Sequence, residues 1–177
     1  MSRLSAGHPS GGPIGAETAP PSRNWRKALL SVHIATAVGV LGTDAVLLAL
    51  GIAGMRGSSP ETVYPAASLV GTWLVAPLAL TALATGALLG VSTKWGLVRY
   101  WWVAIKLGIT FVLNVILFLA LVPLLSNLAD KATAGDALTT ADRMPALVAP
   151  IAAVTLLSLN VVLAVFKPRW RIGSATG

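Results

Sequence analysis

Four long apolar runs, separated by polar segments, make up most of the chain. Hydrophobic residues dominate residues 28–52, 67–91, 99–125 and 146–166. Each run has twenty residues or more, and a helix of that length, at about 1.5 Å per residue, crosses the roughly 30 Å hydrocarbon core of a bilayer. A helix also satisfies its own backbone N–H and C=O groups by hydrogen bonds, whereas lipid offers these groups no partners. The pattern therefore predicts an all-α fold, an integral membrane four-helix bundle.

The flanking segments differ sharply from these runs. Residues 1–24 are rich in Gly, Pro and Ser and predict a disordered tail, and residues 168–177 form a short polar tail. The membrane domain should therefore cover residues 25–167. Its first apolar run is too long for the core of a cleaved signal peptide, so we expect it to remain as the first span.

Within the membrane domain, proline and polar residues predict the breaks. Pro77 lies in the middle of the second run and should kink it. The segment RGSSPETVYP predicts a short loop after the first span, and SNLADKATAGDALTTADRM predicts a loop of about twenty residues with a short surface helix before the fourth.

Composition supports a membrane protein and excludes several other classes. The chain has 177 residues, of which 55% are hydrophobic and 11% charged, against about 25% charged in soluble domains. Its mean hydropathy is +0.79. Cysteine is absent, which excludes disulfides, thiolate metal sites and iron–sulfur clusters.

The basic residues predict the orientation of the chain, because cytoplasmic flanks of membrane spans carry an excess of Lys and Arg. Nine of them flank the spans on one side and three on the other. The first group is Arg3, Arg23, Arg26, Lys27, Lys94, Arg99, Lys167, Arg169 and Arg171; the second is Arg56, Lys131 and Arg143. Both termini should therefore be cytoplasmic, in the cell membrane. Because these charges lie at span ends, the net charge of +7 indicates a lipid bilayer and not nucleic acid as partner.

Aromatic residues at the span ends predict interfacial belts. The predicted cytoplasmic belt consists of Trp25, Trp95, Tyr100, Trp101, Trp102 and Trp170. Tyr64 and Trp73 would mark the opposite face.

Five polar side chains lie inside the predicted spans, at two depths. Counting from the cytoplasmic anchors places His33, Lys106 and Asn160 roughly 9 to 11 Å into the membrane. The same count places Asp44 and Asn114 roughly 21 to 25 Å in. Lys106 and Asp44 therefore differ by about 16 Å in depth and should not form an ion pair.

Each of these side chains has a structural and a functional interpretation. Polar groups in a membrane are costly and usually mark a partner, a cavity or a pathway. Structurally, Lys106 reaches the headgroups, Asp44 reaches water at the outer boundary or is protonated, and His33, Asn114 and Asn160 hydrogen-bond between helices. Functionally, His33, Lys106 and Asn160 form a site in one layer, with Asp44 and Asn114 as a polar pathway.

Ala82, Gly86 and Gly90 form a small-residue stripe on the second span. Such a stripe lets a neighbouring helix approach closely. It serves packing within one chain or a homo-oligomer interface, and the pattern leaves both interpretations open.

Two segments carry a resemblance to known proteins: SVHIATAVGVLGTDAVLL in the first span and KWGLVRYWWVAIKLGIT at the third. Over residues 25–167 the chain resembles an uncharacterised bacterial family of four-span membrane proteins. At greater distance its layout is similar to the HemJ-type protoporphyrinogen oxidases and the CopD-like copper-resistance membrane domains. The resemblance implies a haem-associated fold, in which His33 matches the family histidine and Lys106 the family lysine.

Three functional hypotheses follow. In the first, a redox protein binds haem with His33 as the metal ligand, Lys106 pairing with an anionic group, and Asn160 in the same layer. In the second, the chain is a non-enzymatic scaffold or accessory subunit, because no nucleophile, carboxylate pair or metal-ligand cluster is recognisable. In the third, a proton or metal ion moves from Asp44 through Asn114 toward Lys106 and His33.

Overall fold

The computed structural model describes residues 23–92 and 101–166, and almost all of them are helical. The elements are α1 (Arg23–Met55), α2 (Pro60–Val70), η1 (Gly71–Val75), α3 (Ala76–Ser92), α4 (Trp101–Ile116), η2 (Leu117–Leu121), α5 (Val122–Thr133) and α6 (Thr140–Phe166). The elements α2, η1 and α3 follow one another without a break, as do α4, η2 and α5, so the chain forms four long helices. The all-α class is confirmed. Residues 1–22 of the predicted N-terminal tail, the C-terminal tail, and the basic and aromatic residues at 93–100 and 167–171 lie outside the described residues. Arg23 and Asn24, which we assigned to the tail, instead begin α1.

All four helices are long and apolar enough to cross a membrane, over Asn24–Met55, Pro60–Ser92, Val103–Thr133 and Thr140–Leu163. They run past the predicted spans at the ends joined by the first and third loops, so both loops are shorter than we predicted. The first reduces to residues 56–59 and the third to 134–139.

Local sequence explains where these helices stop and restart. Gly57 and Gly135 have φ angles of 92° and 79°, a conformation that favours glycine and ends a helix. Pro60 stands at the first position of α2, where its missing N–H costs nothing. Before α6, the Thr139 hydroxyl accepts from the Asp142 N–H, while the Asp142 carboxylate accepts from the Thr139 N–H, which is a capping box.

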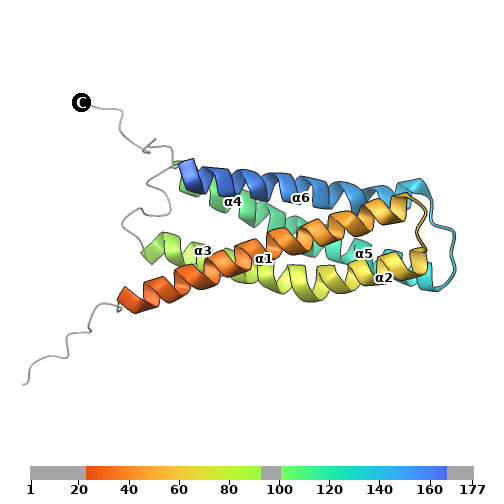
Figure 1. Ribbon diagram of the computed structural model, residues 1–177, viewed down its shortest axis with the longest axis horizontal. Coiled ribbons are helices and arrows are strands. Elements are labelled where there is room, and N and C mark those ends of the chain that lie inside the picture. The colour runs from red at the N-terminus through yellow and green to blue at the C-terminus, as the bar shows by residue number, and fades with distance from the viewer. Residues whose placement is uncertain (1–22, 93–100, 167–177) are drawn as a thin grey trace, which may run out of the picture.

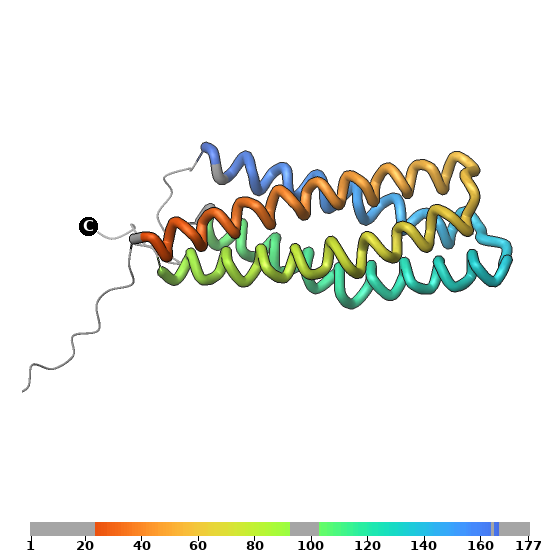
Figure 2. Tube along the Cα trace, turned by 60° about the horizontal axis from the view of Figure 1, so that its bottom comes forward, coloured from red at the N-terminus to blue at the C-terminus, as the bar shows by residue number. Residues whose placement is uncertain are grey.

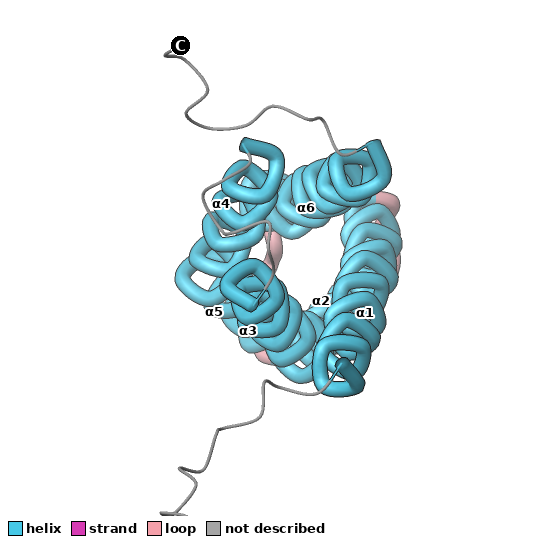
Figure 3. The backbone as a smooth tube through the Cα atoms, turned by 90° about the vertical axis from the view of Figure 1, so that its left-hand side faces the viewer, coloured by secondary structure: helices cyan, strands magenta, loops and turns pink. Residues whose placement is uncertain are grey.

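The four helices run antiparallel along one axis (Figure 1). Figure 2 shows that both short turns lie at the same end, and that α1 begins and α6 ends at the other. Viewed along the axis, the helices surround a common centre (Figure 3). The helix α1 packs against both α3 and α6, and α2 packs against α5. The two ends of the described chain therefore lie at the same end of the bundle. That this end faces the cytoplasm stays a prediction.

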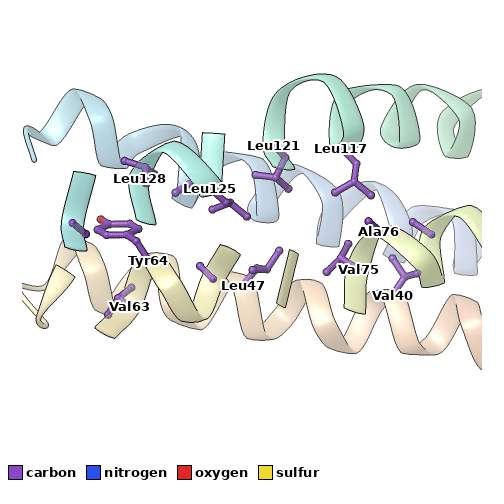
Figure 4. Packing of buried hydrophobic residues seen from close by; sticks show 14 of the residues in the cluster. Val40, Leu47, Val63, Tyr64, Val75, Ala76, Leu117, Leu121, Leu125 and Leu128 are labelled. Carbon is purple, nitrogen blue, oxygen red and sulfur yellow. The ribbon is translucent and has the colours of Figure 1, made fainter. Parts of the chain in front are cut away.

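The apolar core is concentrated in the half of the bundle next to the two turns (Figure 4). Leu47, Tyr64 and Leu125 are each at most 2% exposed there. The assignment of Tyr64 to an interfacial belt is therefore wrong. Its ring enters the core because α1 carries glycine opposite it: a Cβ on Gly54 would lie 2.7 Å from the Tyr64 hydroxyl.

The second and third long helices each contain one π-helical turn, directly before a proline. The turn Gly71–Val75 ends two residues before Pro77, and Leu117–Leu121 ends two residues before Pro123. Proline has no N–H to donate, and its ring collides with the carbonyl four residues earlier, so a wider turn accommodates it. The predicted disturbance at Pro77 thus takes the form of a π turn, and Pro123 produces a second one.

Candidate functional site

The imidazole of His33 is anchored to α3. Its Nδ1 lies 3.1 Å from both the Ala82 carbonyl oxygen and the Thr85 hydroxyl oxygen. A carbonyl only accepts, and the Thr85 hydroxyl already donates to the Thr81 carbonyl at 2.7 Å, so Nδ1 carries the proton and donates to both. In the neutral ring, Nε2 then keeps its lone pair.

This anchoring depends on the small residues of α3. A Cβ on Gly86 would lie 2.9 Å from His33 Cε1, so a larger residue at this position would displace the ring. Ala82 and Gly86 therefore serve packing between α1 and α3, which agrees with the intramolecular interpretation of the small-residue stripe.

The structure also places Lys106 and Asn160 in relation to His33. Lys106 is half-buried on α4, close enough to His33 for the two side chains to interact electrostatically. Asn160 is buried on α6, and its amide donates to the Thr110 hydroxyl at 3.2 Å. The Thr110 hydroxyl in turn donates to the Lys106 carbonyl at 2.9 Å. His33 thus bonds to α3 and Asn160 to α4, while Lys106 interacts with the imidazole electrostatically.

Asp44 faces a cavity inside the bundle. The cavity has a volume of about 70 Å³ and is lined by residues from all four long helices. Asp44, only 3% exposed, comes from α1, and Asn114, 7% exposed, comes from α4. Val75 of the first π turn and Leu117 of the second also line it. The two depth-matched residues, Asp44 and Asn114, therefore share one space.

Neither polar side chain at this cavity is fully satisfied. The Asn114 amide donates to the Thr110 carbonyl at 2.9 Å, but its Oδ1 is buried without a hydrogen-bond partner. Among the described residues, no hydrogen bond or salt bridge reaches the Asp44 carboxylate. The salt bridge in the described part of the chain joins Lys131 and Asp142 at 3.3 Å, away from the cavity.

The structural interpretation that Asp44 reaches water at the outer boundary needs correction. Leu47, Tyr64 and Leu125 lie between Asp44 and the turn end of the bundle, because the helices continue well past the predicted span ends.

Sequence reasoning also missed Thr85 and Thr110. The spacing of Thr110 and Asn114, four residues apart on one helix face, was the available signal.

The outer surface of the bundle carries many large apolar side chains, and several polar side chains are buried next to the apolar core. Leu119, Phe166 and Trp73 are more than 70% exposed on the outside, whereas Asp44, Asn114 and Asn160 are buried. Together with four helices of spanning length, this decides the class. The chain is a multi-pass membrane protein. No family model, curated protein or solved structure matches it.

The interior cavity of this membrane protein does not fit a haem. Its volume of about 70 Å³ is far below the roughly 300 Å³ at which small-molecule pockets begin. His33 does not line it. In the described part of the chain, no group of three or more His, Cys, Asp or Glu residues could hold a metal ion.

Proposed function

We propose that this membrane protein binds a small cation, a proton included, at Asp44 in the interior of the bundle. The observation that carries the proposal is a 3% exposed carboxyl group that faces a cavity and has no hydrogen-bond or ion-pair partner among the described residues. An ionised Asp within a span costs about 2.5 to 3.5 kcal/mol on insertion scales. A bound proton or cation removes that cost.

The other groups at the cavity favour the same class of ligand. The unpaired Oδ1 of Asn114 and the carboxylate of Asp44 are both acceptors, so they suit a proton donor or a hard cation, which prefers oxygen ligands. A volume of about 70 Å³ has room for about two water molecules. It is too small for an organic substrate, so the ligand is an ion or a proton with its water.

A hydrophobic carbodiimide tests the proposal, because it enters membranes and reacts with protonated carboxyl groups. The Asp44 carboxyl adds to the carbodiimide carbon, and the acyl group then shifts to nitrogen, leaving a stable N-acylurea. We expect one adduct at Asp44 by mass spectrometry of the protein in vesicles. Labelling should fall as pH rises, because the ionised carboxylate does not react.

The variant Asp44→Asn should lose this adduct completely. Glu61→Gln is the matched control, since Glu61 is exposed at the start of α2, and the control should keep the adduct. Equal labelling of the parent and Asp44→Asn proteins, or no labelling of Asp44 at any pH, would contradict the proposal and leave the scaffold interpretation in its place.

A second candidate is haem association at His33, outside the Asp44 cavity. The anchored Nδ1–H is the observation that favours it, since ligating histidines commonly donate one ring N–H to a carbonyl and bind metal through the other nitrogen. The ammonium group of Lys106, which interacts electrostatically with the ring, suits an anionic group on the ligand.

For this candidate, protein purified in mild detergent from haem-replete cells should show a Soret band. His33→Ala should abolish the band, whereas His8→Ala, which removes the other histidine of the chain, should preserve it. A spectrum without a Soret band rejects haem association and leaves the Asp44 proposal untouched.

A further inference from the structure

The bundle interior differs on the two sides of Asp44. Toward the two turns, Leu47, Tyr64 and Leu125 are each at most 2% exposed, and the space that they and their neighbours enclose has no room for a water molecule. Figure 4 shows these side chains pointing into the space between the helices. An ion or water cannot reach Asp44 from that side in this conformation.

Toward the opposite end, fewer side chains are buried, and two of the buried ones, Thr85 and Asn160, are polar. Between Val103 and Leu113 on α4, and between Ile151 and Leu159 on α6, no residue is fully buried. Thr110 lines the Asp44 cavity and also accepts from Asn160, so hydroxyl and amide groups lead away from the cavity in this direction. Lys106 lies one helical turn further along α4.

Lys106 lies on the same face of α4 as Thr110 and Asn114, which line the cavity, so an ion that follows this face toward Asp44 passes the half-buried Lys106 side chain. His33 of α1 interacts with it electrostatically, while α3 and α6 contribute the neutral Thr85 and Asn160 to this layer. Among the described residues lining the cavity itself, Asp44 is the one ionisable group. The route therefore presents a positive charge before it reaches the negative site.

Building on the proposed function, we propose that Asp44 exchanges with water only through the Lys106 end, and that Lys106 selects protons over metal cations. A metal ion must pass the ammonium group as a whole charged particle, and it is repelled at close range in a low-dielectric interior. A proton instead moves between hydrogen-bonded groups. The proton leaves either a hydronium ion, which becomes water, or the Lys106 ammonium, which becomes a neutral amine. It then binds to a carboxylate oxygen of Asp44.

The test measures carbodiimide labelling of Asp44 in vesicles at fixed pH and ionic strength, with NaCl or KCl replacing choline chloride. We expect the parent protein to be labelled equally in all three salts. In Lys106→Gln, Na⁺ or K⁺ should lower the labelling of Asp44 severalfold at concentrations that leave the parent unaffected, because a positive charge that differs from Asp44 by about 16 Å in depth is removed. Lys106→Arg should behave as the parent, and Lys27→Gln, exposed near the start of α1, is the position control.

Protection of the parent Asp44 by Na⁺ or K⁺ would overturn the proton selectivity while supporting cation binding. Unchanged salt dependence in Lys106→Gln would remove the role of Lys106. Absence of Asp44 labelling in every protein would reject the proposed function itself. If Lys106→Gln does not fold, the salt dependence of the parent and of Lys106→Arg still decides the selectivity.

The direction of access is tested separately with single cysteines, since the chain has none of its own. In oriented vesicles that enclose catalase, Thr110→Cys should be oxidised by hydrogen peroxide, a neutral molecule little larger than water, added on the side where an N-terminal tag is exposed. Leu121→Cys, which lies at the cavity on the side of the apolar core, should be modified at least tenfold more slowly from either side. Modification of Thr110→Cys from the opposite side only, or fast modification of Leu121→Cys, would overturn the one-sided route.

Discussion

Leu125→Ala is expected to lower the free energy of unfolding by about 2 to 4 kcal/mol. Leu125 is 2% exposed in the core between the helices, and one of its methyl carbons lies 2.8 Å from where a Cβ on Gly71 would stand. Truncation leaves a hole against a helix backbone that cannot collapse into it. The lower end of the range is favoured by the membrane, because helices that separate in lipid do not return the side chain to water.

A reversible unfolding titration in mixed micelles of mild detergent and dodecyl sulfate measures this change. Leu119→Ala is the matched control: Leu119 is 76% exposed in the neighbouring π turn and faces outward. Its substitution should change the unfolding free energy by less than about 0.5 kcal/mol. Similar losses in both variants would show that Leu125 is not in the core.

Gly51→Ala should destabilise the bundle by about 1 to 3 kcal/mol, because it inserts a methyl group between two helices. A Cβ on Gly51 would lie 2.9 Å from the Ala146 carbonyl oxygen and 3.1 Å from the Leu147 Cα. Both are backbone atoms of α6, so no side-chain rotation relieves the clash, and α1 and α6 must move apart.

Gly42→Ala provides the comparison within the same helix. A Cβ there would meet no atom within 4 Å, so the substitution should be neutral or stabilise the protein by up to about 1 kcal/mol through helix propensity. The same micelle titration compares the two variants. Equal stability of Gly51→Ala and the parent would mean that α1 and α6 are not in close contact at this point.

The two sets of experiments address different properties of the same bundle. Leu125 and Gly51 report on the packed half next to the turns, which closes the interior. Asp44 and Lys106 report on the polar half, where the proposed ligand binds. A chain that passes the stability tests and fails the labelling tests would be a correctly folded scaffold without the proposed site.

Much of the architecture could be predicted from residue order alone. Four apolar runs predicted four helices, because backbone hydrogen bonding in lipid leaves few other structures. Counting residues at a constant rise also predicted that Asp44 and Asn114 share a depth, and both line one cavity. The cap formed by Thr139 and Asp142 was likewise readable, although the long third loop was predicted in its place.

The partners of each side chain were decided by tertiary structure. Tyrosine is a residue type common at membrane interfaces, yet Tyr64 is buried because Gly54 of another helix makes room for its hydroxyl. His33 bonds to Ala82 and Thr85 of α3, and nothing in its own helix specifies that choice. Rise along a helix is a local property that counting recovers, whereas the rotation of each helix and its neighbours depend on how four surfaces pack together. The shared level of Asp44 and Asn114 therefore followed from the sequence, and the cavity that they face followed only from the assembled bundle.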